Sequence, residues 1–78
     1  MAIKDLIAAI ARELVEHPDE VEVTEIPGDA STVIELRVAK GDIGKVIGRD
    51  GRTAQSMRAI LAAASARTGR RAHLDIVD

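Results

Sequence analysis

The sequence predicts an α+β fold with the element order α-β-β-α-α-β. An amphipathic helical pattern occupies the first sixteen residues, two β-branched stretches joined by a short polar turn follow it, and two helical apolar patterns then converge on Gly48 and Gly51. An alternating stretch closes the chain. A length of 78 residues suits one small domain, residues 1–78, that buries a modest core.

The first helix is predicted over residues 2–16, because its apolar side chains recur at helical spacing and its charged ones lie elsewhere. Pro18 restricts the residue before it and ends the helix, so residues 17–20 are predicted to form a turn. We expect His17, beside that proline, to be a solvated turn residue rather than a ligand or a base. The apolar stripe consists of Ile3, Leu6, Ile7, Ile10 and Leu14.

Two strands are predicted next. Residues 21–26 alternate β-branched and polar side chains, and Pro27 with Gly28 ends the pattern. After a polar turn, residues 32–39 place Ile34, Leu36 and Val38 on one face. Two such strands joined by a short turn form an antiparallel hairpin.

A short helix is predicted over residues 43–47, with Asp42 as its N-cap. After the turn Gly48, Arg49, Asp50, Gly51, a second helix runs from Arg52 to about Thr68, and Gly69 ends it. The alanines at 62, 63, 64 and 66 indicate close packing against a neighbouring element. A last strand covers residues 70–77. We predict one core that contains Ile7, Ile10, Ile34, Leu36, Ile60, Leu61, Leu74 and Ile76.

Charge is unevenly distributed along the chain. The formal net charge is −2, but residues 1–39 carry three basic and nine acidic side chains, a balance of −6. Residues 40–78 carry eight basic and four acidic ones, a balance of +4. Because local potential guides a polyanion more than net charge does, the second half could present a basic face; the alternative is charge scattered over solvated surfaces.

Several function classes are excluded. A chain without Phe, Tyr or Trp cannot stack bases on aromatic rings, and one without cysteine has no thiolate metal site. The phosphate-binding and dinucleotide-binding glycine patterns are both missing. No nucleophile with a base, carboxylate pair or metal-ligand cluster is evident, so we expect no enzyme activity, no cofactor, no metal and no small-molecule substrate. The longest uncharged run, Ala59–Ala66, is too short to span a bilayer, so a soluble, cytoplasmic protein is expected.

The turn between the two later helices is the candidate site. Glycine at both ends permits unusual backbone conformations and leaves no Cβ to keep another molecule away. The second helix directs its first unpaired N–H groups into this corner, which suits a phosphate oxygen. Lys45, Arg49 and Arg52 add positive charge around it.

The segment VIGRDGR resembles the signature of the KH domain, in which an apolar helix runs into a GXXG loop and a second helix. Gly44 lies four residues before Gly48, and Ile47 directly precedes the loop. The segments HPDEVEVTE, VIELRVA, GKVIGRDGRTAQ and LDIVD extend the likeness to nearly the whole chain, which resembles small bacterial proteins made of one KH domain, the KhpA type.

The resemblance implies a type II KH domain: a three-stranded mixed sheet covered on one face by helices. In that family the GXXG loop, here Gly48, Arg49, Asp50 and Gly51, contacts the sugar-phosphate backbone of single-stranded RNA. A groove that would be lined here by Ile43, Gly44 and Ile47 accepts about four unpaired bases. Lys45, Arg52 and Arg58 would add electrostatic attraction.

Two positions depart from the family pattern. Many KH loops are basic where Asp50 stands, and this carboxylate could weaken phosphate contact or cap the second helix. Ala54 stands where many members have isoleucine, which leaves a smaller side chain in the core.

The resulting hypothesis is a non-catalytic single-stranded RNA-binding protein, for which the roles of RNA chaperone and post-transcriptional regulator are both open. The alternative is a protein interaction module with little RNA affinity of its own. The resemblance implies pairing in either case, as a homodimer, as a heterodimer with a larger KhpB (Jag)-type protein, or both.

Overall fold

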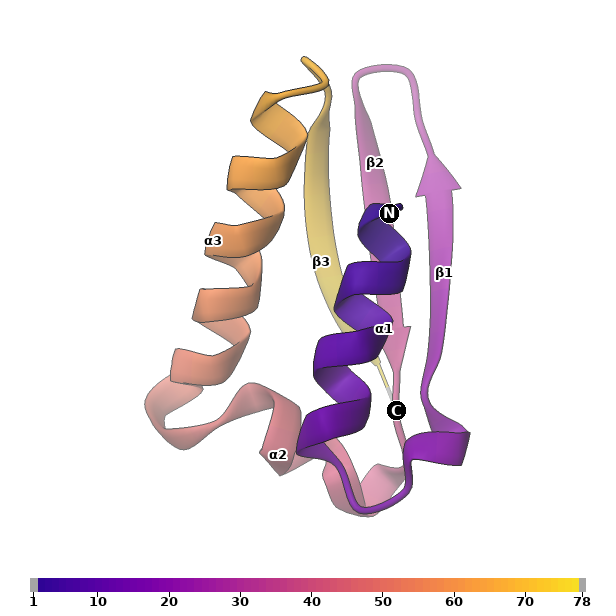
Figure 1. Cartoon of the computed structure of the whole chain (residues 1–78), viewed down its shortest axis with the longest axis vertical. Coiled ribbons are helices and arrows are strands. Elements are labelled where there is room, and N and C mark those ends of the chain that lie inside the picture. Colours follow the sequence, from indigo (N-terminus) through magenta and orange to yellow (C-terminus); the bar gives the residue numbers. More distant parts are fainter. Residues whose placement is uncertain (1, 78) are drawn as a thin grey trace.

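The computed structural model describes residues 2–77, and the predicted order of elements is confirmed. Each predicted boundary lies within two residues of the observed one. Single 3₁₀ turns, η1 (Pro18–Glu20), η2 (Lys40–Asp42) and η3 (Arg49–Gly51), stand between longer elements. The helices and strands, labelled in Figure 1, are α1 (Ile3–Leu14), β1 (Glu22–Pro27), β2 (Ser31–Arg37), α2 (Ile43–Ile47), α3 (Arg52–Ala66) and β3 (Arg71–Val77).

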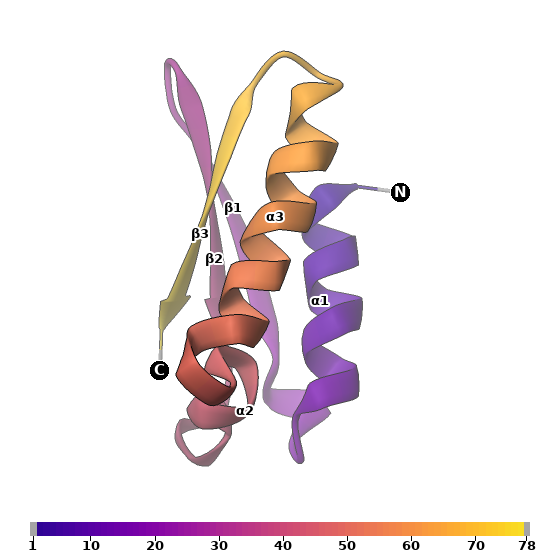
Figure 2. The same ribbon diagram turned by 90° about the vertical axis from the view of Figure 1, so that its left-hand side faces the viewer.

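The three strands form one mixed sheet in the order β1-β2-β3. β1 runs antiparallel to β2, while β2 and β3 are parallel, so Ile34 lies between Glu25 and Leu74. Parallel neighbours need a crossover connection, and α2 with α3 supplies it. Figure 2 shows α1 and α3 side by side on one face of the sheet. The predicted α+β architecture, a mixed sheet covered on one face by helices, is confirmed.

The core lies between this sheet face and the two long helices. Side chains alternate along a strand, and every second residue of β2, including Ile34 and Leu36, is buried. Ile7 comes from α1, Leu61 from α3 and Leu74 from β3. The predicted core members Ile10 and Ile76 are partly buried and pack against this cluster.

The predicted burial of Ile60 is wrong, since 42% of it is exposed. The buried stripe of α3 is instead Ala54, Met57, Leu61 and Ser65. Successive side chains point about 100° apart around a helix axis, so the neighbouring residues 60 and 61 cannot both point into the core. The predicted close packing of the alanine run is also wrong, because positions 62, 63 and 66 are exposed and position 64 is half-buried.

Asp42 does not cap α2 as predicted. Its buried carboxylate accepts hydrogen bonds from the backbone N–H groups of Glu16, at 3.3 Å, and His17, at 3.0 Å. His17 Nδ1 lies 3.0 Å from Oδ2 of the same carboxylate. His17 is half exposed, but it is a partner of Asp42 rather than merely a solvated turn residue. This cluster ties the end of α1 to the start of α2 and so positions the loop that follows.

Candidate nucleic-acid interface

The corner between α2 and α3 is built from left-handed backbone conformations. Gly48 has a φ of 77° and Gly51 a φ of 74°, while the non-glycine residue Asp50 has a φ of 57°. A Cβ at Gly48 would also overlap the Thr53 side chain, so the fold itself requires this glycine. A Cβ at Gly51 would meet no atom within 4 Å, which leaves only its φ as a restriction.

Asp50 does not cap α3, which corrects the role suggested from the sequence. The N-cap of α3 is Gly51, and no side chain hydrogen-bonds to the first turn of the helix from that position. Short polar side chains such as aspartate tolerate the left-handed conformation better than most, which explains how Asp50 fits the turn. The N–H of Arg52 already donates to the Arg49 carbonyl oxygen, so an anion at the corner would have to use the N–H groups that follow it in the first turn of α3.

The basic residues around the corner differ in their surroundings. Arg49 and Arg52 are exposed, and within residues 2–77 neither forms an ion pair or side-chain hydrogen bond. Lys45 Nζ, in contrast, lies 3.6 Å from Glu16 Oε1 and 3.6 Å from Asp42 Oδ1. The two arginines are thus the cations at the loop, while acidic groups partly neutralise Lys45.

The exposed side of α2 leaves its backbone open at Gly44. A Cβ there would meet no atom within 4 Å, and the residue does not have a left-handed φ. Neither packing nor backbone conformation within the described chain therefore requires glycine at this position. Ile43 and Ile47 on either side are half-buried, and Ile43 packs against the core. All three residues predicted to line the groove hence lie on α2, next to the loop.

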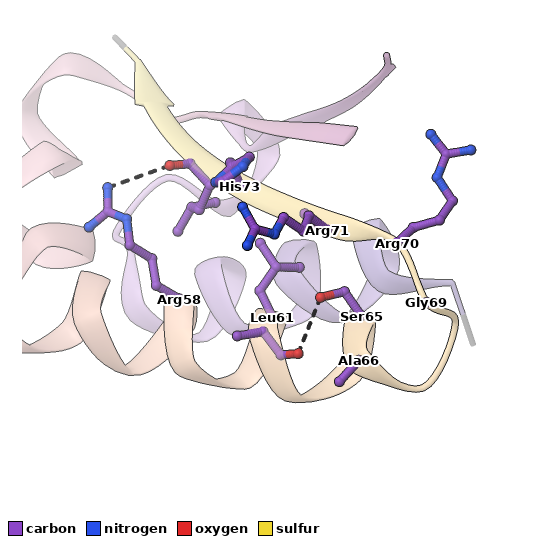
Figure 3. A pocket seen from close by; sticks show the side chains of 11 residues that line it. Arg58, Leu61, Ser65, Ala66, Gly69, Arg70, Arg71 and His73 are labelled. Carbon is purple, nitrogen blue, oxygen red and sulfur yellow. Dashed lines mark hydrogen bonds between the residues drawn. The ribbon is translucent and has the colours of Figure 1, made fainter. Parts of the chain in front are cut away.

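A groove of about 550 Å³ lies between α3 and β3, and Figure 3 shows it from close by. Arg58 reaches across it from α3, with a nitrogen 3.5 Å from the Leu74 carbonyl oxygen. Of the RNA-binding residues predicted from the sequence, only Arg58 is among those that line this groove. The lining consists of Arg58, Leu61, Ala62, Ser65, Ala66, Gly69, Arg70, Arg71, Ala72, His73 and Leu74.

Sequence reasoning missed most of this groove. The available signals were the alanines of the second helix, whose exposure leaves a shallow surface, and the consecutive arginines 70 and 71 at the start of the last strand. Only the pairing of β3 beside α3 brings these two stretches together, and the sequence pattern does not specify that contact. Within residues 2–77, no group of His, Cys, Asp or Glu residues could hold a metal ion, and no helix is long and apolar enough to cross a membrane.

Residues 4–76 match a family model described as KhpA/KhpB, KH domain. A protein of Aquifex aeolicus (strain VF5) named RNA-binding protein KhpA is 47% identical over 99% of this chain and 98% of its own length. A protein of the same name from Borreliella burgdorferi is 47% identical over 95% of this chain and 90% of its own length.

A solved structure of Era from Aquifex aeolicus, bound to GDP and AlF4⁻, also resembles the chain. The TM-score is 0.51 and the sequence identity 24%, over 97% of this chain. The match covers only 31% of the Era chain. This likeness concerns the fold alone.

Proposed function

Because the chain belongs to the KhpA/KhpB family of KH domains, whose members are RNA-binding proteins and not enzymes, we propose that its glycine corner holds the backbone of single-stranded RNA. Gly48, Arg49, Asp50 and Gly51 would contact the sugar-phosphate backbone. Arg49 and Arg52 would supply most of the electrostatic attraction. Lys45 and Arg58 would contribute once RNA displaces their present partners.

The observation that carries the proposal is the corner itself. Two exposed arginines flank an N-terminus of α3 that no side chain caps, beside Gly51, where a Cβ would meet no atom and another backbone has room to approach. Charge-assisted hydrogen bonds from such groups suit phosphate oxygens. In this proposal, the exposed surface of Ile43, Gly44 and Ile47 receives unpaired bases by aliphatic contact, since the chain has no aromatic ring.

Gly44→Ala tests the open backbone of α2. An added methyl group meets no neighbour, and alanine favours a helix over glycine by about 0.5 to 1 kcal/mol, so the variant should fold at least as stably as the wild type. The same methyl should reduce affinity for a single-stranded oligouridylate. Denaturant unfolding should therefore give an equal or higher stability for Gly44→Ala than for the wild type, while fluorescence anisotropy should give a lower RNA affinity.

Arg49→Asp tests the loop charge without disturbing either glycine. It should weaken RNA binding by about ten-fold or more, because it replaces a phosphate contact by a carboxylate beside Asp50. Lys4→Asp, an equal charge change on the exposed first turn of α1, is the matched control. If Arg49→Asp is folded by circular dichroism and binds like the wild type, the loop is only a helix corner. The interaction-module reading would then be the better one.

Pairing of the chain is a second proposal, and it rests on α3. Ile60 is a large apolar residue that is 42% exposed there, and the alanines at 59 and 63 beside it are exposed as well. We assign to this face the pairing with a second copy or with a larger KhpB-type protein. We further propose that the protein works in the cytoplasm as one KH domain spanning residues 1–78.

A further inference from the structure

The groove between α3 and β3 begins at Arg58, six residues along α3 from its first residue, and extends to Gly69, Arg70 and Arg71 beyond the far end of that helix. We propose that single-stranded RNA held at the corner runs on along this groove to a second phosphate anchor at Arg71. The inference rests on the proposed function of the corner and extends it. The site would then take a longer strand than the about four nucleotides that a KH loop clamps.

Geometry supports a continuous track. α3 begins at Arg52, directly after the loop, and its fifteen residues extend for about 22 Å. The lining residues Arg58, Ala62 and Ala66 recur every four residues along the helix, so they share one side of it. That side faces β3, so a strand that leaves the corner and follows α3 would reach the groove at Arg58, the lining residue nearest the start of the helix.

The chemistry of the groove matches nucleic acid rather than an acidic or a purely apolar ligand. Its lining contains three arginines and a histidine but no acidic side chain. Its apolar part is aliphatic, with exposed Ala62 and Ala66 opposite half-buried Ala72. Small side chains leave space for a base, while the basic rim attracts the phosphates that connect the bases.

Arg71 is the best placed of the three arginines to act as the anchor. Arg58 is hydrogen-bonded to the Leu74 carbonyl, and a nitrogen of Arg70 lies 2.8 Å from the Gly28 carbonyl oxygen. Arg71 is exposed and forms no hydrogen bond or ion pair through its side chain within the described chain. In Figure 3 its side chain lies along the groove between Arg58 and Arg70, above Leu61.

The test compares Arg71→Gln with Arg67→Gln, which removes the same charge near the same end of the molecule but outside the groove. Binding of oligouridylates of about four and about eight nucleotides is measured by anisotropy at several salt concentrations. Arg71→Gln should leave the affinity for the short strand within error of the wild type. It should weaken binding of the long strand by about three- to ten-fold and reduce its log–log salt slope by about 0.7. Arg67→Gln should follow the wild type for both lengths.

The possible outcomes distinguish a failure of the extended track to Arg71 from a failure of RNA binding at the corner. If no oligouridylate of either length binds the wild type, the RNA function of the corner fails. If both lengths bind but Arg71→Gln lowers neither affinity selectively, the corner binds RNA and the extended track is wrong. An equal loss in Arg67→Gln would also overturn the track, since it would show only a general effect of positive charge.

Discussion

At the scale of single residues, the Asp42 carboxylate joins the end of α1 to the start of α2, the helix that leads into the loop. Burial favours its neutral form, but hydrogen bonds from the His17 side chain and from the Glu16 and His17 amides outweigh burial, so the pKa of Asp42 is below its ordinary 3.8. The pKa of His17 is raised above its ordinary 6.5, first by its hydrogen bond to Asp42 and then by the charge of that carboxylate. Both shifts favour the ionised pair in the folded state.

Stability should therefore depend on pH through this pair. The contribution of His17 is fully present below 6.5 and is lost as the pH rises through its raised folded pKa. The contribution of Asp42 is present above 3.8 and is lost as the pH falls through its lowered folded pKa. The ion pair should stabilise the fold most between these two limits.

Denaturant unfolding of the wild type and of His17→Gln across this range and up to pH about 8 measures the effect. Glutamine removes the titrating ring while it keeps a polar side chain. The stability advantage of the wild type over His17→Gln should shrink steadily above pH 6.5. If the unfolding free energies of the two proteins instead keep a constant difference as the pH rises, the pKa of His17 does not change on folding.

At the scale of elements, the sequence predicted every helix and strand but not the rotation of α3 about its axis. Strands with alternating side chains have two possible faces, and the predicted face of β2 is the buried one. A helix such as α3, with many alanines, offers several weakly distinguished faces, and the choice between Ile60 and its neighbour Leu61 was not encoded locally. Packing against β3 and α1 decides it. The role of Asp42 was mispredicted for a similar reason. An aspartate at the start of a helix is predicted to cap that helix, and the sequence does not show that the turn at His17 lies beside it.

The rotation of α3 predicts a sharp difference between two adjacent residues. Leu61→Ala should cost about 2 to 5 kcal/mol of unfolding free energy, because Leu61 is 1% exposed and its loss leaves a cavity. Ile60→Ala should cost roughly 1 kcal/mol or less, since the site is partly exposed and alanine favours the helix. Urea unfolding at concentrations where the midpoint no longer depends on protein concentration gives both values. Equal costs would place both side chains in the core.

At the scale of the whole molecule, α3 separates two surfaces with different properties. The groove side carries Arg58 and Ala62, whereas Ile60 lies two residues from each of them and so points to nearly the opposite side of the helix. The sequence revealed the basic character of the second half and the glycine corner, which are local features. It did not reveal the α3–β3 groove, because that surface forms only when β3 pairs in parallel with β2 and so comes to lie beside α3.

This separation means that pairing through Ile60 would leave both grooves of a dimer open. Two linked grooves would raise the effective affinity for one RNA strand without any new kind of contact, provided that the strand can reach both. A short aliphatic groove has few anchors against the entropy lost on binding, so pairing would benefit RNA binding directly.

Light scattering of the concentrated protein, with and without oligouridylate, tests pairing. The wild type should have the mass of two chains, and Ile60→Glu the mass of one, because a carboxylate enclosed in an apolar contact has no partner and costs several kcal/mol. Gln55→Glu adds the same charge to an exposed position of α3 that lies about 140° around the helix from Ile60, and it should leave the dimer intact. A wild type that stays monomeric both with and without RNA would contradict self-pairing. Titration with a larger KhpB-type protein would then show whether the Ile60 face binds that partner instead, and Ile60→Glu should abolish such a complex as well.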